Sequence, residues 1–150
     1  MGKKKIAKQT TEDALKEKAQ LEEAYSKVAG KSVSKKFASG RVYITVSYNN
    51  TLITITDEKG NVVAWSSAGS LGFSGPKKAT PFAAAKVVAA LYEKIQKSGP
   101  FDVDVFVSGI GGGRDSALRS LANRGFTFNS IKDVTPIPHN GPRPKKVRRV

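Results

Sequence analysis

The segment GIGGGRDS, residues 109–116, has the residue types best suited to holding a phosphate. It connects an expected strand to an expected helix, which is the geometry that presents free backbone amides to an anion. It is not a Walker A loop, because no Gly-Lys-Ser/Thr follows it, and Arg114 stands where a dinucleotide-binding fingerprint has its third glycine. We therefore expect no nucleotide cofactor. The loop could instead bind a phosphate of a polymer such as a nucleic acid. The alternative is that it is simply a tight turn whose backbone conformation requires glycine.

The groups that catalysis and metal binding require are scarce. The chain has no cysteine and one histidine, His139, in a proline-rich segment, so thiolate chemistry and zinc sites with two or more histidines are excluded. Two-metal nuclease chemistry needs clustered carboxylates, but the first expected strand, 41–48, has none. Asp102 and Asp104 are an ordinary pair of surface acids. We expect no enzymatic activity, catalytic residue, metal site or small-molecule substrate.

A net charge of +14 sets this chain of 150 residues apart from an average soluble domain. The net charge is +5 over residues 1–40, +4 over 41–133 and +5 over 134–150. This excess predicts a polyanionic partner. No apolar run is long enough for a membrane helix, and no apolar segment follows the basic start as in a secretory signal. The sequence favours a cytoplasmic protein without membrane contact.

Residues 136–150 are expected to form a basic C-terminal tail. They hold four of the seven prolines, and five of the last eight residues are basic. Proline favours extended backbone and removes amide donors, so this segment does not build a core of its own. Its arginines can fork onto phosphate oxygens while its lysines act as point charges. The alternatives are a solvated tail and a nuclear-localisation run.

An N-terminal extension, residues 1–36, is expected to carry a helix over about 10–29. Thr10 and Asp13 predict a capping box, and Gly30 predicts the helix end. A thin apolar stripe follows the helical spacing, at Ala14, Leu21, Ala24, Tyr25 and Val28. A solvated extension is favoured over docking on a partner, and residues 31–40 resemble a basic linker.

Residues 37–135 are expected to form the globular domain, with the element order βββαβαβ. Apolar residues alternate along its strands, first at Val42, Ile44, Val46 and Tyr48 and later at Val103, Val105 and Val107. The other strands are expected at 51–57, 62–68 and 126–134, with a hairpin turn at Asn49–Asn50 and a bulge near Asn129. The final β-α-β unit requires parallel pairing. The expected fold is α/β, a mixed five-stranded sheet with helices packed against its faces.

Thr80 is expected to cap the first helix of this domain, with Pro81 at its first position and Gly99–Pro100 after its end. Its apolar face is expected to comprise Phe82, Ala85, Val88, Ala89, Tyr92 and Ile95. The second helix is expected over 115–123, stopped by Gly125. The glycine-rich loop 69–79 precedes the first helix. Its Phe73, Lys77 and Lys78 suit base stacking and backbone contact with RNA, although paired loop lysines are commonly only solvated.

Four motifs together resemble the family of ribosomal protein eleven of the small subunit, in its bacterial-type form. They are NNTLITITDEKGNVVAW, GFSGPKKATPFAAAKVV, GGGRDSALRSLANRGF and IKDVTPIPHNGPRPKKVRRV, and the resemblance covers about residues 37–150. It implies a ribonuclease-H-like sheet without catalytic carboxylates. It also implies binding to small-subunit ribosomal RNA in the platform, beside other small-subunit proteins and near the messenger exit, where the Shine–Dalgarno helix forms. The alternative is a basic nucleic-acid-binding protein outside the ribosome.

The resemblance also implies which residues contact ribosomal RNA. They are Asn49, Asn50 and Thr51 in the hairpin; Gly72, Phe73, Gly75, Lys77 and Lys78 in the basic loop; Gly111, Gly113, Arg114 and Ser116 in the glycine loop; and His139, Asn140, Gly141, Arg143, Lys145, Lys146, Arg148 and Arg149 in the tail. The chain departs from the family where Ile110 and Gly112 replace prolines, and where Ser74 and Lys77 replace more basic or bidentate residues. The helix at 10–29 extends beyond the family's usual start.

Overall fold

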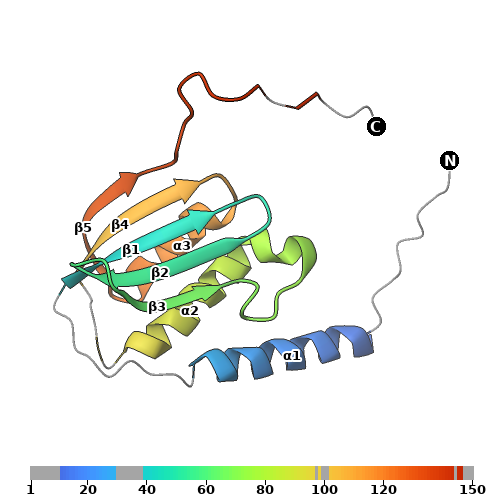
Figure 1. The fold of residues 1–150 in the computed structure, drawn as a ribbon. Helices are drawn as coiled ribbons and strands as arrows, with labels where there is room; N and C mark the ends of the chain where they lie inside the picture. Colours follow the sequence, from blue (N-terminus) through green and yellow to red (C-terminus); the bar gives the residue numbers. More distant parts are fainter. Residues whose placement is uncertain (1–10, 30–38, 97, 99–101, 144, 147–150) are drawn as a thin grey trace.

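A computed structural model describes residues 11–29, 39–96, 98, 102–143 and 145–146 of the chain. The elements follow the predicted order, preceded by the N-terminal helix (Figure 1). They are α1 (Thr11–Ala29), β1 (Ser39–Val46), β2 (Thr51–Asp57), β3 (Val62–Ser67), a short 3-10 helix η1 (Gly75–Ala79), α2 (Pro81–Ile95), β4 (Asp102–Gly109), α3 (Gly113–Asn123) and β5 (Thr127–Asp133). Thr10, Gly30 and the pair 99–100, for which capping roles were predicted, lie outside the described residues.

The five strands form one mixed sheet in the order β3-β2-β1-β4-β5. The first three strands pair antiparallel, whereas β4 runs parallel to β1 and to β5. The pairing of β4 with β5 steps from Val103↔Phe128 to Asp104↔Ser130, which leaves Asn129 unpaired. The predicted parallel unit and the predicted bulge are both confirmed. At this bulge the edge strand shifts its side-chain alternation.

The hydrophobic core lies on one face of the sheet. Val42, Ile44 and Val46 of β1 and the valines of β4 are buried on this face. Both α2 and α3 cover it, packed against each other, and Figure 1 draws them together behind the strands. The sequence order predicted that helices would pack on the sheet, but not that both would share one face. No described helix packs on the opposite face, which we call the open face; Tyr43 and Phe106 stack on it with ring centroids 5.1 Å apart.

Strand β1 differs from its prediction at both ends. It begins at Ser39, inside the expected linker, and it ends at Val46. Tyr48 therefore lies beyond the strand with 77% of its surface exposed, and its predicted place in the buried row is wrong. Helix α3 begins at Gly113, two residues before the predicted start, because the last glycine of the loop already takes helical geometry.

Helix α2 begins as predicted and buries a broader face than predicted, which includes the predicted Val88, Ala89 and Ile95. The Thr80 side chain accepts a hydrogen bond from the Ala83 amide at 3.2 Å, and Pro81 occupies the first turn. The predicted face was wrong at Phe82, which is 60% exposed. The buried positions are Ala83, Ala84, Val87, Val88, Ala89, Ala90, Leu91 and Ile95. They cover more than one stripe, because the sheet, α3 and α1 all contact this helix.

Candidate nucleic-acid interface

The turn between β1 and β2 holds the first predicted RNA-contacting residues. The Ser47 hydroxyl accepts hydrogen bonds from the amides of Asn49 (3.3 Å) and Asn50 (3.0 Å), and the Ser47 amide donates to the Asn50 carbonyl at 2.9 Å. Neither asparagine takes a positive φ, although asparagine is favoured in hairpin turns because it tolerates that conformation. Thr51 is fully buried, and its hydroxyl has no hydrogen-bond partner. Asn49 is exposed, whereas Asn50 is half-buried with its side-chain oxygen inaccessible, so Asn49 is the residue of this turn most available to a ligand.

The glycine loop packs directly against this turn. A Cβ on Gly109, where φ is +89°, would lie 1.9 Å from the Val46 carbonyl oxygen. A Cβ on Gly111 would lie 2.7 Å from the Ser47 carbonyl oxygen, and one on Gly113 would lie 2.3 Å from the Thr51 hydroxyl. Such distances leave no room for a side chain. The glycines are therefore required by the fold itself, whatever the loop binds.

Arg114 has partners inside the protein. Its guanidinium donates to the Gly109 carbonyl at 2.9 Å and forms an ion pair with Asp133 at 2.5 Å. The Asp133 carboxylate also accepts from the amide (2.9 Å) and the hydroxyl (2.6 Å) of Thr135. The hydrogen bonds from Thr135, followed by that from Arg114, lower the pKa of Asp133 to about 2. These contacts fix the direction in which the chain leaves β5. RNA contact by Arg114 stays a prediction.

Ser116 is also engaged within the fold. Its hydroxyl donates to the Pro81 carbonyl at 2.7 Å, which ties the start of α3 to the start of α2. A Cβ on Gly112 would lie 3.6 Å from the Ala79 carbonyl oxygen, so the glycine loop also touches the end of η1. The basic loop and the glycine loop, more than thirty residues apart in sequence, are thereby neighbours in space.

The basic loop presents its residues unevenly. Gly72 has φ +87° and lies beneath α1, where an added Cβ would come within 3.3 Å of the Ala24 Cβ. Phe73 is half-buried against the core, with its ring edge-on to Phe82 at 6.1 Å. Gly75 has φ +53° with open space around it. Lys77 is exposed and Lys78 half-buried, both in the last turn of η1. Gly72, Gly75 and Lys77 are exposed, whereas Phe73 and Lys78 are half-buried.

Helix α1 packs on the globular domain. Besides the Ala24 contact, the Tyr25 hydroxyl donates to the Glu93 carboxylate of α2. Burial, then the hydrogen bond to Glu93, raises the pKa of Tyr25 to about 12. The favoured sequence interpretation, a solvated extension, was wrong for these residues. The side chains of Ala14 and Val28 lie outside those described.

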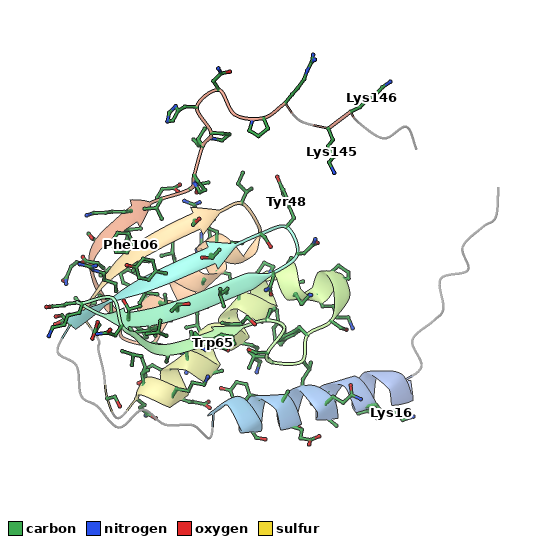
Figure 2. The ribbon with its side chains drawn as sticks, in the orientation of Figure 1. Lys16, Tyr48, Trp65, Phe106, Lys145 and Lys146 are labelled. Carbon is green, nitrogen blue, oxygen red and sulfur yellow. The ribbon has the colours of Figure 1, made fainter. Side chains whose placement is uncertain are left out.

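The C-terminal tail leaves the domain from the same end of the sheet. The Val134 amide donates to the Val107 carbonyl at 2.8 Å, and the Gly109 amide donates to the Thr135 hydroxyl at 3.1 Å. The described residues beyond Thr135 form no helix or strand and are exposed (Figure 1). Asn140 has φ +52°, the one positive value among the described non-glycine residues. Figure 2 shows Lys145 and Lys146 on this extended segment; Arg148 and Arg149 lie outside the described residues.

All four predicted segments therefore meet at one end of the domain. Parallel strands present their carboxyl ends at the same sheet edge, and the glycine loop and the tail follow two such ends. The β1–β2 turn touches the glycine loop, which touches the end of the basic loop. We name this region the convergent end. Sequence reasoning found its members separately but could not place them together.

The sequence analysis did not identify the open face of the sheet as a surface that carries aromatic and basic side chains. Besides the stacked pair Tyr43 and Phe106, Lys132 places its ammonium 5.8 Å from the Phe106 ring centroid. Trp65 lies on this face and is 54% exposed. These side chains occupy the positions that alternate with the buried residues of each strand, and this alternation could have identified them from the sequence.

The described residues include no group of three or more His, Cys, Asp or Glu side chains placed to hold a metal ion. Among the described helices, none is both long and apolar enough to cross a membrane.

Comparison with known proteins identifies relatives over most of the chain. The sequence profile of the family described as "Ribosomal protein S11" matches residues 40–149. A protein of Treponema pallidum (strain Nichols) named "Small ribosomal subunit protein uS11" is 54% identical over 111 residues, which are 74% of this chain and 88% of that relative. A protein of the same name from Sulfurovum sp. (strain NBC37-1) is 50% identical over 124 residues, 82% of this chain and 100% of that relative. The matched family region begins at the first core strand and excludes α1.

Proposed function

Because the chain belongs to the ribosomal protein S11 family, we propose that it is a structural component of the small ribosomal subunit that binds ribosomal RNA with its convergent end and its tail. The protein is not an enzyme. Within the subunit it lies in the platform, near the messenger exit and beside other small-subunit proteins. The ribosome-bound protein acts in the cytoplasm.

The observation that carries this proposal is the meeting of the four segments at one end of the sheet. A ligand that touches the asparagine turn there also reaches the glycine loop and the root of the tail. Folded RNA is recognised mainly through its shape and its phosphates, and a composite surface of loops suits this mode of binding. The exposed Asn49 offers hydrogen bonds, and Lys77 and Lys78 offer positive charge.

The tail adds reach and charge to this surface. Arg143, Lys145 and Lys146 are exposed along an extended backbone, and each can neutralise a phosphate and release a counterion. The Arg114–Asp133–Thr135 contacts set the angle at which this segment departs. Arg114 thus contributes to RNA binding by positioning the tail.

Sedimentation tests the proposal. Cell extract is resolved on a density gradient at low and moderate salt, and the protein is located with an antibody. We expect it in the small-subunit peak under both conditions. Absence from that peak, with the protein spread over bulk nucleic acid, would contradict the proposal and support the alternative of a nucleic-acid-binding protein outside the ribosome.

A further inference from the structure

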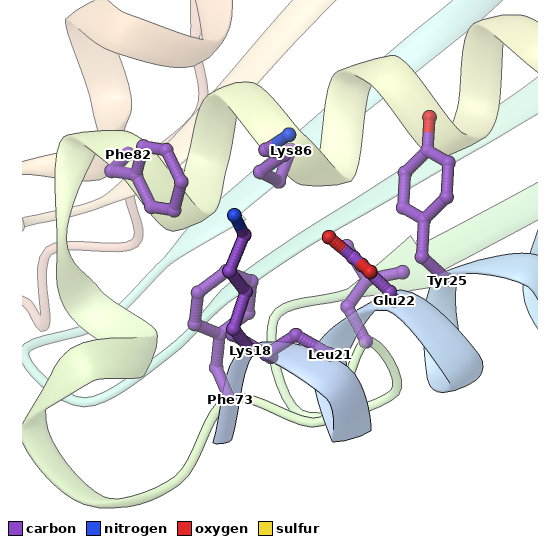
Figure 3. A pocket seen from close by; sticks show the side chains of 8 residues that line it. Lys18, Leu21, Glu22, Tyr25, Phe73, Phe82 and Lys86 are labelled. Atoms are coloured by element: carbon purple, nitrogen blue, oxygen red, sulfur yellow. The ribbon is translucent and has the colours of Figure 1, made fainter. Parts of the chain in front are cut away.

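A groove separates α1 from the body of the protein. Its volume is about 230 Å³, and it is lined by α1, by the loop before η1 and by the first half of α2 (Figure 3). The lining residues are Lys18, Leu21, Glu22, Tyr25, Leu71, Phe73, Phe82 and Lys86. A second hollow of about 330 Å³ shares Leu21, Phe73 and Phe82 with the first and continues to Lys77 and Thr80. We call the two hollows together the α1 groove.

The floor of the α1 groove is aromatic and open to a ligand. Phe82 is 60% exposed, although it belongs to a helix that buries most of its apolar residues. Phe73 meets it edge-on, with ring planes inclined at 81°. An apolar ring held in place by a neighbouring ring offers a fixed flat surface, and nucleobases of single-stranded RNA stack on such surfaces.

The rim of the α1 groove is positive. Lys18, Lys77 and Lys86 line it from three elements, and Glu22 is the one acidic residue among the described lining residues. The Lys86 ammonium lies 5.7 Å from the Phe82 ring centroid, and Figure 3 shows Lys18 reaching from α1 toward α2, where Lys86 and Phe82 lie. No described acid forms an ion pair with Lys18 or Lys86. Ammonium groups around an aromatic floor fit a base flanked by its two phosphates.

We propose that the α1 groove binds one unstacked nucleotide of single-stranded RNA, the base against Phe82 and the flanking phosphates against Lys18, Lys77 and Lys86. This inference rests on the proposed RNA-binding function. It adds a site built partly from α1, which lies outside the matched family region. The net charge of +14 and the continuity of the groove with the basic loop favour RNA over an acidic protein segment.

Binding of a fluorescent single-stranded RNA octamer to the full-length protein tests the site. Stacking of one base on an aromatic ring corresponds to about 5- to 140-fold in affinity, so we expect Phe82→Ala to weaken binding by that factor. Phe82→Leu, which keeps an apolar side chain but no ring, is expected to weaken it as well. Trp65→Ala removes a similarly exposed ring from the open face of the sheet and is expected to leave binding within about twofold.

The controls separate this inference from the proposed function. Thermal melts confirm that each variant is folded. If Phe82→Ala binds the octamer like the unmodified protein, or weakens it no more than Trp65→Ala, the groove site is refuted. The proposed function stands in that case if the protein still sediments with the small subunit, and it fails independently if the protein does not.

Ultraviolet cross-linking of assembled small subunits gives a second test. Tryptic cleavage releases the peptide 79–86, which contains Phe82. We expect a nucleotide adduct on this peptide. Adducts confined to the tail, or a chemical cross-link from Lys86 to an acidic segment of another protein, would overturn the proposal.

Discussion

Replacing Gly109 by alanine tests whether the glycine loop is shaped by the fold. This residue has φ +89°, a conformation that costs a residue with a Cβ about 1–2 kcal/mol. The new Cβ would also lie 1.9 Å from the Val46 carbonyl oxygen, so β1 and β4 must separate at their carboxyl ends. Overpacking of this kind costs about 1–3 kcal/mol. The free energy of unfolding should therefore fall by about 2–5 kcal/mol.

Gly60→Ala is the matched control. Gly60 has φ +90°, but nothing lies within 4 Å of the Cβ that alanine would add. Only the conformational cost applies, and we expect a loss of about 1–2 kcal/mol. Urea unfolding followed by the fluorescence of Trp65, the single tryptophan, measures both variants. A loss for Gly109→Ala no larger than that for Gly60→Ala would refute the close-packing argument.

Two further predictions concern the contacts that hold the tail and α1. Because the pKa of Asp133 is lowered to about 2, its bonds to Thr135 stabilise the folded state above about pH 4 and are lost as the pH falls toward 2. The protection factor of the Thr135 amide, which is its intrinsic exchange rate at a given pH divided by the rate measured by NMR, should fall across that window; a protection factor that stays constant would contradict this prediction. Tyr25→Phe removes the hydrogen bond to Glu93. Because Tyr25 is only half-buried and Glu93 is exposed, we expect the free energy of unfolding, measured with urea, to fall by only about 0.5–1 kcal/mol. A fall above about 2 kcal/mol would show that this hydrogen bond contributes more than solvent screening allows.

Local patterns predicted much of the fold. The two-residue period of β1 and β4 identified their buried faces, because a half-buried strand alternates regardless of its partners. The Thr80–Pro81 pair located the start of α2, since a cap needs only neighbouring residues. The slip in alternation after Phe128 identified the bulge for the same reason.

Features that depend on contacts between residues distant in sequence could not be predicted from local patterns. The exposure of Phe82 and the burial of Ala84 follow from where the sheet, α3 and α1 meet α2, which helical periodicity alone does not encode. Arg114 in α3 suggested a phosphate ligand, yet its partner Asp133 lies at the end of β5. That the four segments form one surface could likewise be seen only once the order of the strands in the sheet was known.

The salt dependence of binding to small-subunit platform RNA tests the central claim most directly. Deleting residues 139–150 removes five basic residues, and every phosphate that is no longer neutralised lowers the slope of log K against log salt by about 0.7–0.9. We predict a slope shallower by about 3.5–4.5 units and a smaller change when residues 2–8, with four lysines, are removed instead. A slope unchanged by the tail deletion would contradict the claim that the tail binds RNA phosphates.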